Sequence, residues 1–378
     1  MSTTAAPRSV RDPGPTRRLL VAALAAATGL CVTALGTGIA VRYAMKQGLT
    51  ATALLGAVVL LVGLTAFVLA WRVAWRATPR WKRLWFAPLA LVVLLSLFSM
   101  AQGTMLALTP RTSLGSSTPG DLGLRYEEVA FSTSDGVRLS AWFLPGRNGA
   151  AVITVPGAGS TRTATLRQAA VLARHGYAVL MVDPRGQGRS EGRGMDAGWY
   201  GDRDLGAAVR YLRQSSYRVG VLGLSMGGEA AIGAAAAVPE ILAVVAEGAT
   251  HRTAADKAGY LPGGLAGAVQ RVLDRLTFGT AALLSPAPRP ATLHSAVRRA
   301  DATPFLLIAG GGAVDETEAS AYLEQAAPER VETWTVPRAT HTHGLDTAPE
   351  EWASRVTAFF DRALLEGDGV PGREVPRS

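Results

Sequence analysis

A serine stands at the centre of the pentapeptide G-L-S-M-G at 223–227. The apolar run 217–222 before it has the composition of a strand, and the Ala-rich run 228–238 after it favours a helix. Glycines on both sides let strand and helix approach closely, so the turn between them can lift the hydroxyl clear of the sheet. The helix N-terminus then supplies a backbone N–H and a partial positive charge. This context predicts that Ser225 is a nucleophile.

A serine nucleophile needs a base and a group that orients the base. The apolar run 304–310 predicts a buried strand, and Asp315 lies just past its end. The run 331–336 predicts another strand and leads to His341. An imidazole can take the serine proton and return it to a leaving group, while a carboxylate orients the ring. Because active groups collect at the carboxyl ends of strands in open α/β sheets, we expect Asp315 and His341 to lie beside Ser225.

Two of these assignments have alternatives. Glu316 and Glu318 follow Asp315, and any of the three acids could be a surface residue at a helix start. His343 could replace His341, since a turn and the last predicted helix follow both. We favour Asp315 and His341.

The other histidines have structural interpretations. His175 precedes a glycine at a predicted helix end, where capping is the expected role. His251 follows the sixth predicted strand, and His294 lies in a segment without a motif. The H-T-H at 341–343 is too short for a metal signature and has no cysteine or acid cluster to complete it. We therefore expect no metal and no cofactor.

Three sequence blocks resemble the α/β-hydrolase superfamily, on its serine peptidase and esterase side. They are P-G-A-G-S at 156–160, D-P-R-G-Q-G-R-S at 183–190 and G-L-S-M-G-G at 223–228. The second block is similar to the loop after the fourth strand in prolyl-oligopeptidase-like and aminopeptidase-like members. The resemblance covers about 126–365 and implies a mostly parallel sheet with helices on both faces. One departure is Pro156, where many lipases and esterases carry histidine.

The resemblance also implies an oxyanion hole, because the tetrahedral intermediate of acyl transfer needs donors already aimed at it. The N–H of Met226 is one expected donor, and the N–H of Ala158, in the loop after the third strand, is the other. The implied reaction is hydrolysis of an ester or amide/peptide bond through a Ser225 acyl-enzyme, with a small-molecule ester or peptide as substrate. The alternative is a non-catalytic membrane protein that uses the fold as a binding module.

The first 110 residues form a predicted membrane region. Uncharged apolar runs near 19–41, 50–71 and 85–108 each reach the ~20 residues that cross a bilayer as a helix. Tryptophans cluster between the second and third runs, as in an interfacial belt. The length of the first run and the lack of a small-x-small cleavage site favour an uncleaved helix. The sequence therefore predicts a multi-pass membrane protein.

Basic residues predict the orientation of these helices. Four arginines precede the first run and five basic residues separate the second from the third, against Arg42 and Lys46 in the remaining loop. Positive loops stay inside, so three crossings place the domain that follows outside the cytoplasm.

The rest of the chain divides by composition. We expect a Gly/Ser/Thr/Pro-rich linker at 111–124, a hydrolase domain at 125–365 with a lid-like insertion near 252–302, and a polar tail at 366–378.

The formal net charge of +9 does not indicate nucleic-acid binding. Residues 1–111 carry twelve Lys/Arg and one acid, a net of +11, so the remainder carries −2. The basicity thus flanks the membrane runs, where it meets anionic lipid. The single cysteine, Cys31, lies in the first run, so the predicted hydrolase domain cannot form disulfides.

Overall fold

A computed structural model describes residues 15–366 of the chain. Contacts divide the chain into two compact units, with the boundary between Met105 and Leu106. The predicted tail from residue 367 on, and Arg8 and Arg11 of the N-terminal basic cluster, lie outside the described residues.

The first unit is built from three long apolar helices. They are α1 (Pro15–Gln47), α2 (Ala51–Ala77) and α3 (Phe86–Ala107), the last preceded by a 3-10 turn at Arg80–Trp85. All three are long and apolar enough to cross a membrane, which suggests membrane association. Helices α1 and α2 pack closely at small residues: a Cβ on Gly36 would lie 2.2 Å from the backbone nitrogen of Leu60. Large apolar side chains such as Leu61 remain exposed on these helices.

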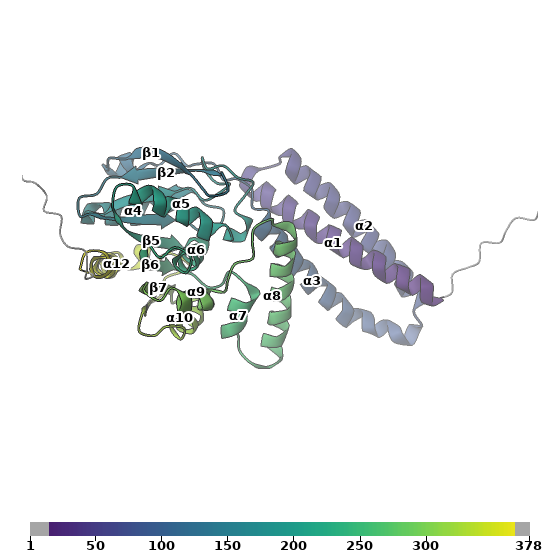
Figure 1. Ribbon diagram of the computed structural model, residues 1–378. Coiled ribbons are helices and arrows are strands. Elements are labelled where there is room, and N and C mark those ends of the chain that lie inside the picture. The colour runs from purple at the N-terminus through teal and green to yellow at the C-terminus, as the bar shows by residue number, and fades with distance from the viewer. Residues whose placement is uncertain (1–14, 367–378) are drawn as a thin grey trace, which may run out of the picture. The chain divides into compact units, whose positions relative to one another are not determined.

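The second unit contains one eight-stranded sheet (Figure 1). Its strands are β1 (Glu127–Ser132), β2 (Arg138–Leu144), β3 (Ala150–Val155), β4 (Ala178–Val182), β5 (Arg218–Leu224), β6 (Ile241–Glu247), β7 (Phe305–Gly310) and β8 (Val331–Val336). Their order is β1-β2-β4-β3-β5-β6-β7-β8. Strand β2 pairs antiparallel with β1 and β4, and every other pairing is parallel. The sheet is thus mostly parallel, as predicted.

Helices cover both faces of this sheet. One buried cluster joins the sheet to α5 (Gly201–Arg213), α6 (Met226–Ala235), α9 (Leu293–Arg299) and α10 (Glu316–Glu324). The other joins it to α4 (Leu166–His175), α11 (Gly344–Thr347) and α12 (Pro349–Leu364). Every residue of β3, β4 and β7 is buried, because a strand covered on both faces has no side chain in water.

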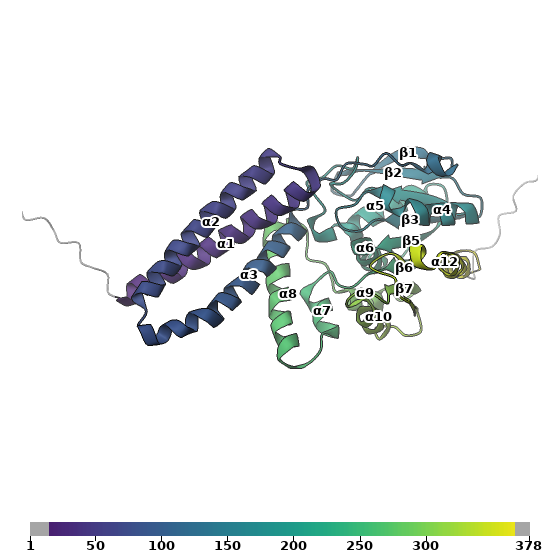
Figure 2. The ribbon, with the colours of Figure 1, turned by 180° about the vertical axis from the view of Figure 1, so that it is seen from behind.

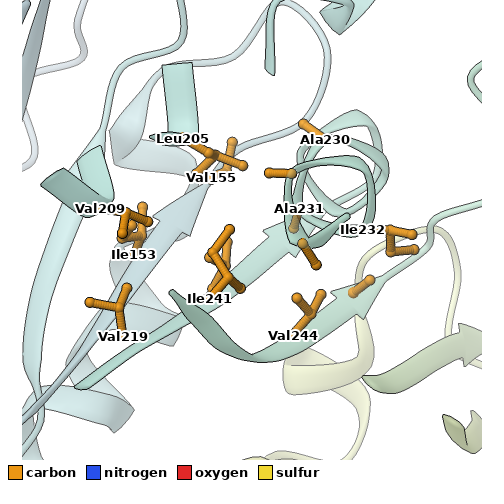
Figure 3. Packing of buried hydrophobic residues seen from close by; sticks show 14 of the residues in the cluster. Ile153, Val155, Leu205, Val209, Val219, Ala230, Ala231, Ile232, Ile241 and Val244 are labelled. Atoms are coloured by element: carbon orange, nitrogen blue, oxygen red, sulfur yellow. The ribbon is translucent and has the colours of Figure 1, made fainter. Parts of the chain in front are cut away.

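Figure 3 shows part of the first cluster, in which short side chains of α6 meet β-branched residues of the sheet. Ala230, Ala231 and Ile232 of α6 lie over the strands, and α5 contributes Leu205 and Val209. This packing fixes α6, and with it the turn that precedes α6, against the sheet.

The segment between β6 and β7 covers the range 252–302, where the sequence analysis expected a lid-like insertion. It contains α7 (Ala254–Tyr260) and α8 (Gly264–Leu284), a pair of helices connected by a short turn (Figure 2), and then α9. Helix α8 is the longest helix of this segment.

The predicted linker at 111–124 is held against the rest of the second unit. Arg111 donates to the carbonyls of Gly188 and Ser190 at 2.9 and 2.7 Å, and the N–H of Thr112 donates to Gln187 Oε1 at 2.8 Å. These acceptors belong to the 183–190 block. Part of that block therefore fixes the start of the predicted linker.

A buried ion pair organises the loops above the sheet. Asp183 follows β4, and its carboxylate accepts from the backbone N–H of Arg162 at 2.8 Å and lies 3.3 Å from that residue's guanidinium. Both side chains are fully buried, and the guanidinium also stacks 4.6 Å from the ring centre of Trp142. Arg162 lies just after the 156–160 loop, so this pair ties that loop to the 183–190 block.

Asp183→Asn should therefore destabilise the protein strongly. The substitution leaves the buried Arg162 guanidinium without its counter-charge, which typically costs about 3–5 kcal/mol and should lower Tm by roughly 10 °C. The control is Arg189→Gln in the same block, because Arg189 pairs with Glu128 on an exposed surface and should change stability by less than about 1 kcal/mol. Thermal unfolding of the full chain in detergent measures both, and equal shifts would contradict this view of the buried pair.

Candidate functional site

Ser225 lies at a sharp turn between β5 and α6. Its φ of 53° and ψ of −124° fall in a region that a non-glycine residue rarely adopts, so the turn is strained. The N–H of Ser225 donates to the carbonyl of Glu247, the last residue of the neighbouring strand β6, at 2.7 Å. This bond and the packing of α6 hold the strained conformation.

The two flanking glycines are required by the close approach of the chain. A Cβ on Gly223 would lie 2.3 Å from the backbone of Gly227. A Cβ on Gly227 would lie 2.4 Å from the carbonyl oxygen of Val155 at the end of β3. The residues that the sequence singled out thus allow the turn to sit between strand, helix and the loop after β3.

His341 lies in the loop between β8 and α11, beside Ser225. Its Nε2 is 2.8 Å from Ser225 Oγ, and its Nδ1 is 2.5 Å from Glu316 Oε1. His343 instead has Nδ1 2.7 Å from the backbone carbonyl of His341, and its ring is exposed. The structure therefore brings His341, and not His343, to the serine.

The carboxylate beside the histidine belongs to Glu316, and the prediction of Asp315 is wrong on this point. Asp315 has a left-handed φ of 67°, and its carboxylate lies 3.6 Å from Lys257 Nζ. This turn lets the next residue, at the start of α10, project toward His341. The Glu316 side chain is only 2% exposed, and its second oxygen accepts from the N–H of Gly310 at 2.7 Å.

The carboxylate of Glu316 sets the electrostatics of the histidine. Its hydrogen bond raises the pKa of His341 above the ordinary value, against the opposing effect of partial burial. With the Nδ1 proton donated to Glu316, Nε2 is left as an acceptor for the Ser225 hydroxyl. Such a chain of contacts can draw a proton from the serine as its oxygen attacks a substrate.

The two residues predicted as oxyanion donors, Ala158 and Met226, lie beside Ser225. The loop of Ala158 passes beside the serine, since a Cβ on Gly157 would lie 3.2 Å from Ser225 Cβ. Met226 is the first residue of α6, where backbone N–H groups have no partner within the helix. Among the described residues, neither the N–H of Ala158 nor that of Met226 donates a hydrogen bond. Both can therefore point toward a bound anion.

Ser225 and His341 open onto a cleft of about 460 Å³. Its remaining lining comes from the loop after β3, the start of α4, the end of β5, the histidine loop and α11: Gly157, Ala158, Ser160, Thr163, Ala164, Arg167, Gln168, Leu224, Thr342, His343 and Asp346. Arg167 and Asp346 form an ion pair with each other. The cleft is wide enough for a small-molecule substrate.

Two buried glutamates, which the sequence analysis did not select, support this arrangement. Glu247 accepts from the N–H of Gly344 at 2.7 Å and from the indole N–H of Trp352 at 2.9 Å, so it fixes the histidine loop. Burial raises the pKa of Glu247. Glu229, in the first turn of α6, accepts from the N–H of Thr250 and of His251. Burial raises the pKa of Glu229 to about 7.

The other histidines lie in structural surroundings. His175 ends α4 and has Nε2 2.9 Å from Asp361 Oδ2. His251 has Nδ1 3.1 Å from the hydroxyl of Tyr260, and burial lowers its pKa to about 4. His294 stacks on Tyr322, with ring centres 4.8 Å apart. Within residues 15–366, no three metal-ligating side chains form a group that could hold an ion.

Comparison with known proteins identifies relatives of the second unit. The chain is 33% identical over 119 residues to the protein Rv2307c of Mycobacterium tuberculosis, which is 30% of this chain and 42% of that protein. It is 35% identical over 119 residues to the thiohydrolase aneE of Aspergillus aculeatus, covering 29% and 37% of the two chains. The chain thus spans less than half the length of these curated relatives.

A solved structure covers more of the chain. The esterase Pf2001 of Pyrococcus furiosus is 29% identical, with a TM-score of 0.56 over 68% of this chain and 97% of the esterase. The model of the serine aminopeptidase S33 family matches residues 146–337, which is just over half of the 378 residues. The described fold and this match agree, and the chain belongs to the serine aminopeptidase S33 family of α/β-hydrolases.

Proposed function

We propose that the protein is a membrane-associated serine hydrolase of the esterase type that acts through a Ser225 acyl-enzyme. The observation that carries this proposal is the unbroken contact chain from Glu316 Oε1 through His341 to Ser225 Oγ. A non-catalytic binding module would have no need to bury a carboxylate against a histidine that contacts a strained serine.

The proposed reaction follows from the positions of these atoms. His341 Nε2 takes the proton of Ser225 Oγ as this oxygen bonds to the carbonyl carbon of the substrate. The N–H groups of Ala158 and Met226 stabilise the resulting oxyanion. His341 then protonates the departing alcohol, and an acyl-enzyme remains. A water molecule, activated by the same histidine, releases the acid and restores the serine.

An ester is a better match to the cleft than an aminopeptidase substrate. An aminopeptidase binds a protonated α-amine, which calls for an unpaired carboxylate. Among the described residues that line the cleft, the acidic side chain is that of Asp346, and Arg167 already neutralises it. The likeness to an esterase supports the same choice, and the relative named thiohydrolase makes a thioester the second candidate.

Ser225→Ala should reduce kcat by roughly 10³–10⁶-fold on p-nitrophenyl esters, because it removes the nucleophile and not a packing contact. His341→Ala should abolish labelling of Ser225 by a fluorophosphonate probe. The matched control is His343→Ala, which should keep most of the activity. An aminoacyl amide series run beside the esters tests the substrate class. Normal turnover by the Ser225 variant would remove this residue from the mechanism, and faster cleavage of aminoacyl amides would favour a peptidase.

The pH dependence distinguishes the two neighbouring acids. The base works only when neutral, and Glu316 raises the pKa of His341, so kcat/KM should fall as the pH drops through a midpoint above about 6.5. Glu316→Gln should move that midpoint to lower pH and reduce kcat by roughly 10²–10⁴-fold. Asp315→Asn should leave the midpoint in place. A midpoint that moves in Asp315→Asn and stays in place in Glu316→Gln would instead identify Asp315 as the acid of the triad.

We also propose that the hydrolase unit lies outside the cytoplasm, because nine basic residues flank the segments placed inside and two lie in the opposite loop. With Cys31 replaced by serine, a cysteine introduced at the exposed Ser354 of α12 should react with a membrane-impermeant maleimide in intact cells. Reaction only after permeabilisation would reverse the orientation. Labelling after permeabilisation is the reference for full reaction.

A further inference from the structure

We propose that α8 is an interfacial helix whose exposed face binds the surface of an anionic lipid bilayer. The proposal concerns a face of α8 that does not line the cleft of Ser225, and it holds whether or not Ser225 is the nucleophile.

The exposed face of α8 is apolar along its whole length. Leu265, Val269, Val272 and Leu283 have exposed fractions of 81%, 41%, 57% and 85%. Their spacings of four, three and eleven residues put them on one side of a helix. The opposite side carries the buried residues Gly267, Asp274 and Ala281. Helix α8 buries Asp274 and exposes Leu265 and Leu283. This is the pattern expected when the exposed face contacts an apolar environment.

The charges beside this face suit a negatively charged surface. Arg275 of α8 and Arg289 line a groove of about 370 Å³, together with the apolar Phe278, Gly279 and Ala282. Among the described residues, neither arginine forms an ion pair or a hydrogen bond with the protein. The one acid of α8, Asp274, is buried and lies near Lys257 and Gln270. Unpaired guanidinium groups next to an apolar stripe match lipid phosphates next to acyl chains.

Contacts within its own unit hold α8 near the end of α3. A small core cluster joins Ala107, the last residue of the candidate span α3, to Ala281 of α8 and to Trp199. These residues all belong to the unit that starts at Leu106. The C-terminal half of α8 is therefore held at the point where the chain leaves the third candidate span. If α3 spans a bilayer, the surface of that bilayer is the apolar partner that we assign to this face.

Single-cysteine labelling tests this contact in the full chain. With Cys31, the only cysteine, replaced by serine, cysteines are introduced at Val269, at Val272 and, as a matched control, at the exposed Ser354 of α12. Each is labelled with an environment-sensitive fluorophore and reconstituted into phosphatidylcholine vesicles with or without phosphatidylglycerol. Labels at 269 and 272 should be quenched by nitroxide-bearing lipid and protected from iodide, whereas the label at 354 should show the reverse.

The arginines give a second readout. Phosphatidylglycerol should strengthen the nitroxide quenching at 269 and 272, and Arg275→Gln with Arg289→Gln should weaken this lipid dependence by about fivefold per arginine in the docked-to-free ratio. Labels at 269 and 272 that are as open to iodide as the label at 354 would overturn the proposal. Protection from iodide without nitroxide quenching would also overturn it, since another protein surface, such as a second copy of the chain, would then cover α8.

Discussion

The contact chain from Glu316 through His341 to Ser225 depends on three loops that follow three different strands. Strands β5, β7 and β8 contribute these loops, and the parallel register of the sheet places their carboxyl ends at one edge. Strand β6 lies between β5 and β7 in the sheet, and its last residue, Glu247, contacts both ends of the arrangement. Its carbonyl accepts from the N–H of Ser225, and its carboxylate accepts from the N–H of Gly344. Glu247, which is buried and does not line the cleft, thus links the serine turn to the histidine loop.

The sequence predicted best those features that depend on residues close together in the chain. The glycine-flanked serine between a strand and a helix, the strands that lead to it, and the three apolar runs could be recognised because each depends on neighbouring residues. The sequence analysis favoured Asp315, but the acid that contacts His341 is the next residue, Glu316. The left-handed backbone at Asp315 turns Glu316, and not Asp315, toward His341. The sequence shows two adjacent acids but does not show this backbone conformation. Glu247 and Glu229 could not be selected, since their partners are distant in the sequence.

The segment before the hydrolase unit shows the same limit. Its Gly/Ser/Thr/Pro content favours a free spacer, yet Arg111 and Thr112 bond to the 183–190 block. The block was recognised as a resemblance to other hydrolases, and its contacts explain part of what it does: Asp183 secures the loop above β3, and its neighbours secure the entry of the chain. The insertion is likewise connected to the site, because Lys257 of α7 lies 3.6 Å from Asp315 and 3.9 Å from Asp274 of α8.

The central claim is that Ser225 becomes acylated during turnover. Rapid mixing of the enzyme with a p-nitrophenyl ester, followed by acid quench and peptide mass mapping, tests this directly. We predict a burst of p-nitrophenol close to one equivalent per enzyme wherever deacylation is the slower step, and an acyl group on the peptide that contains Ser225. An acyl group on a different residue, or steady turnover with no acylated peptide under any quench condition, would contradict it.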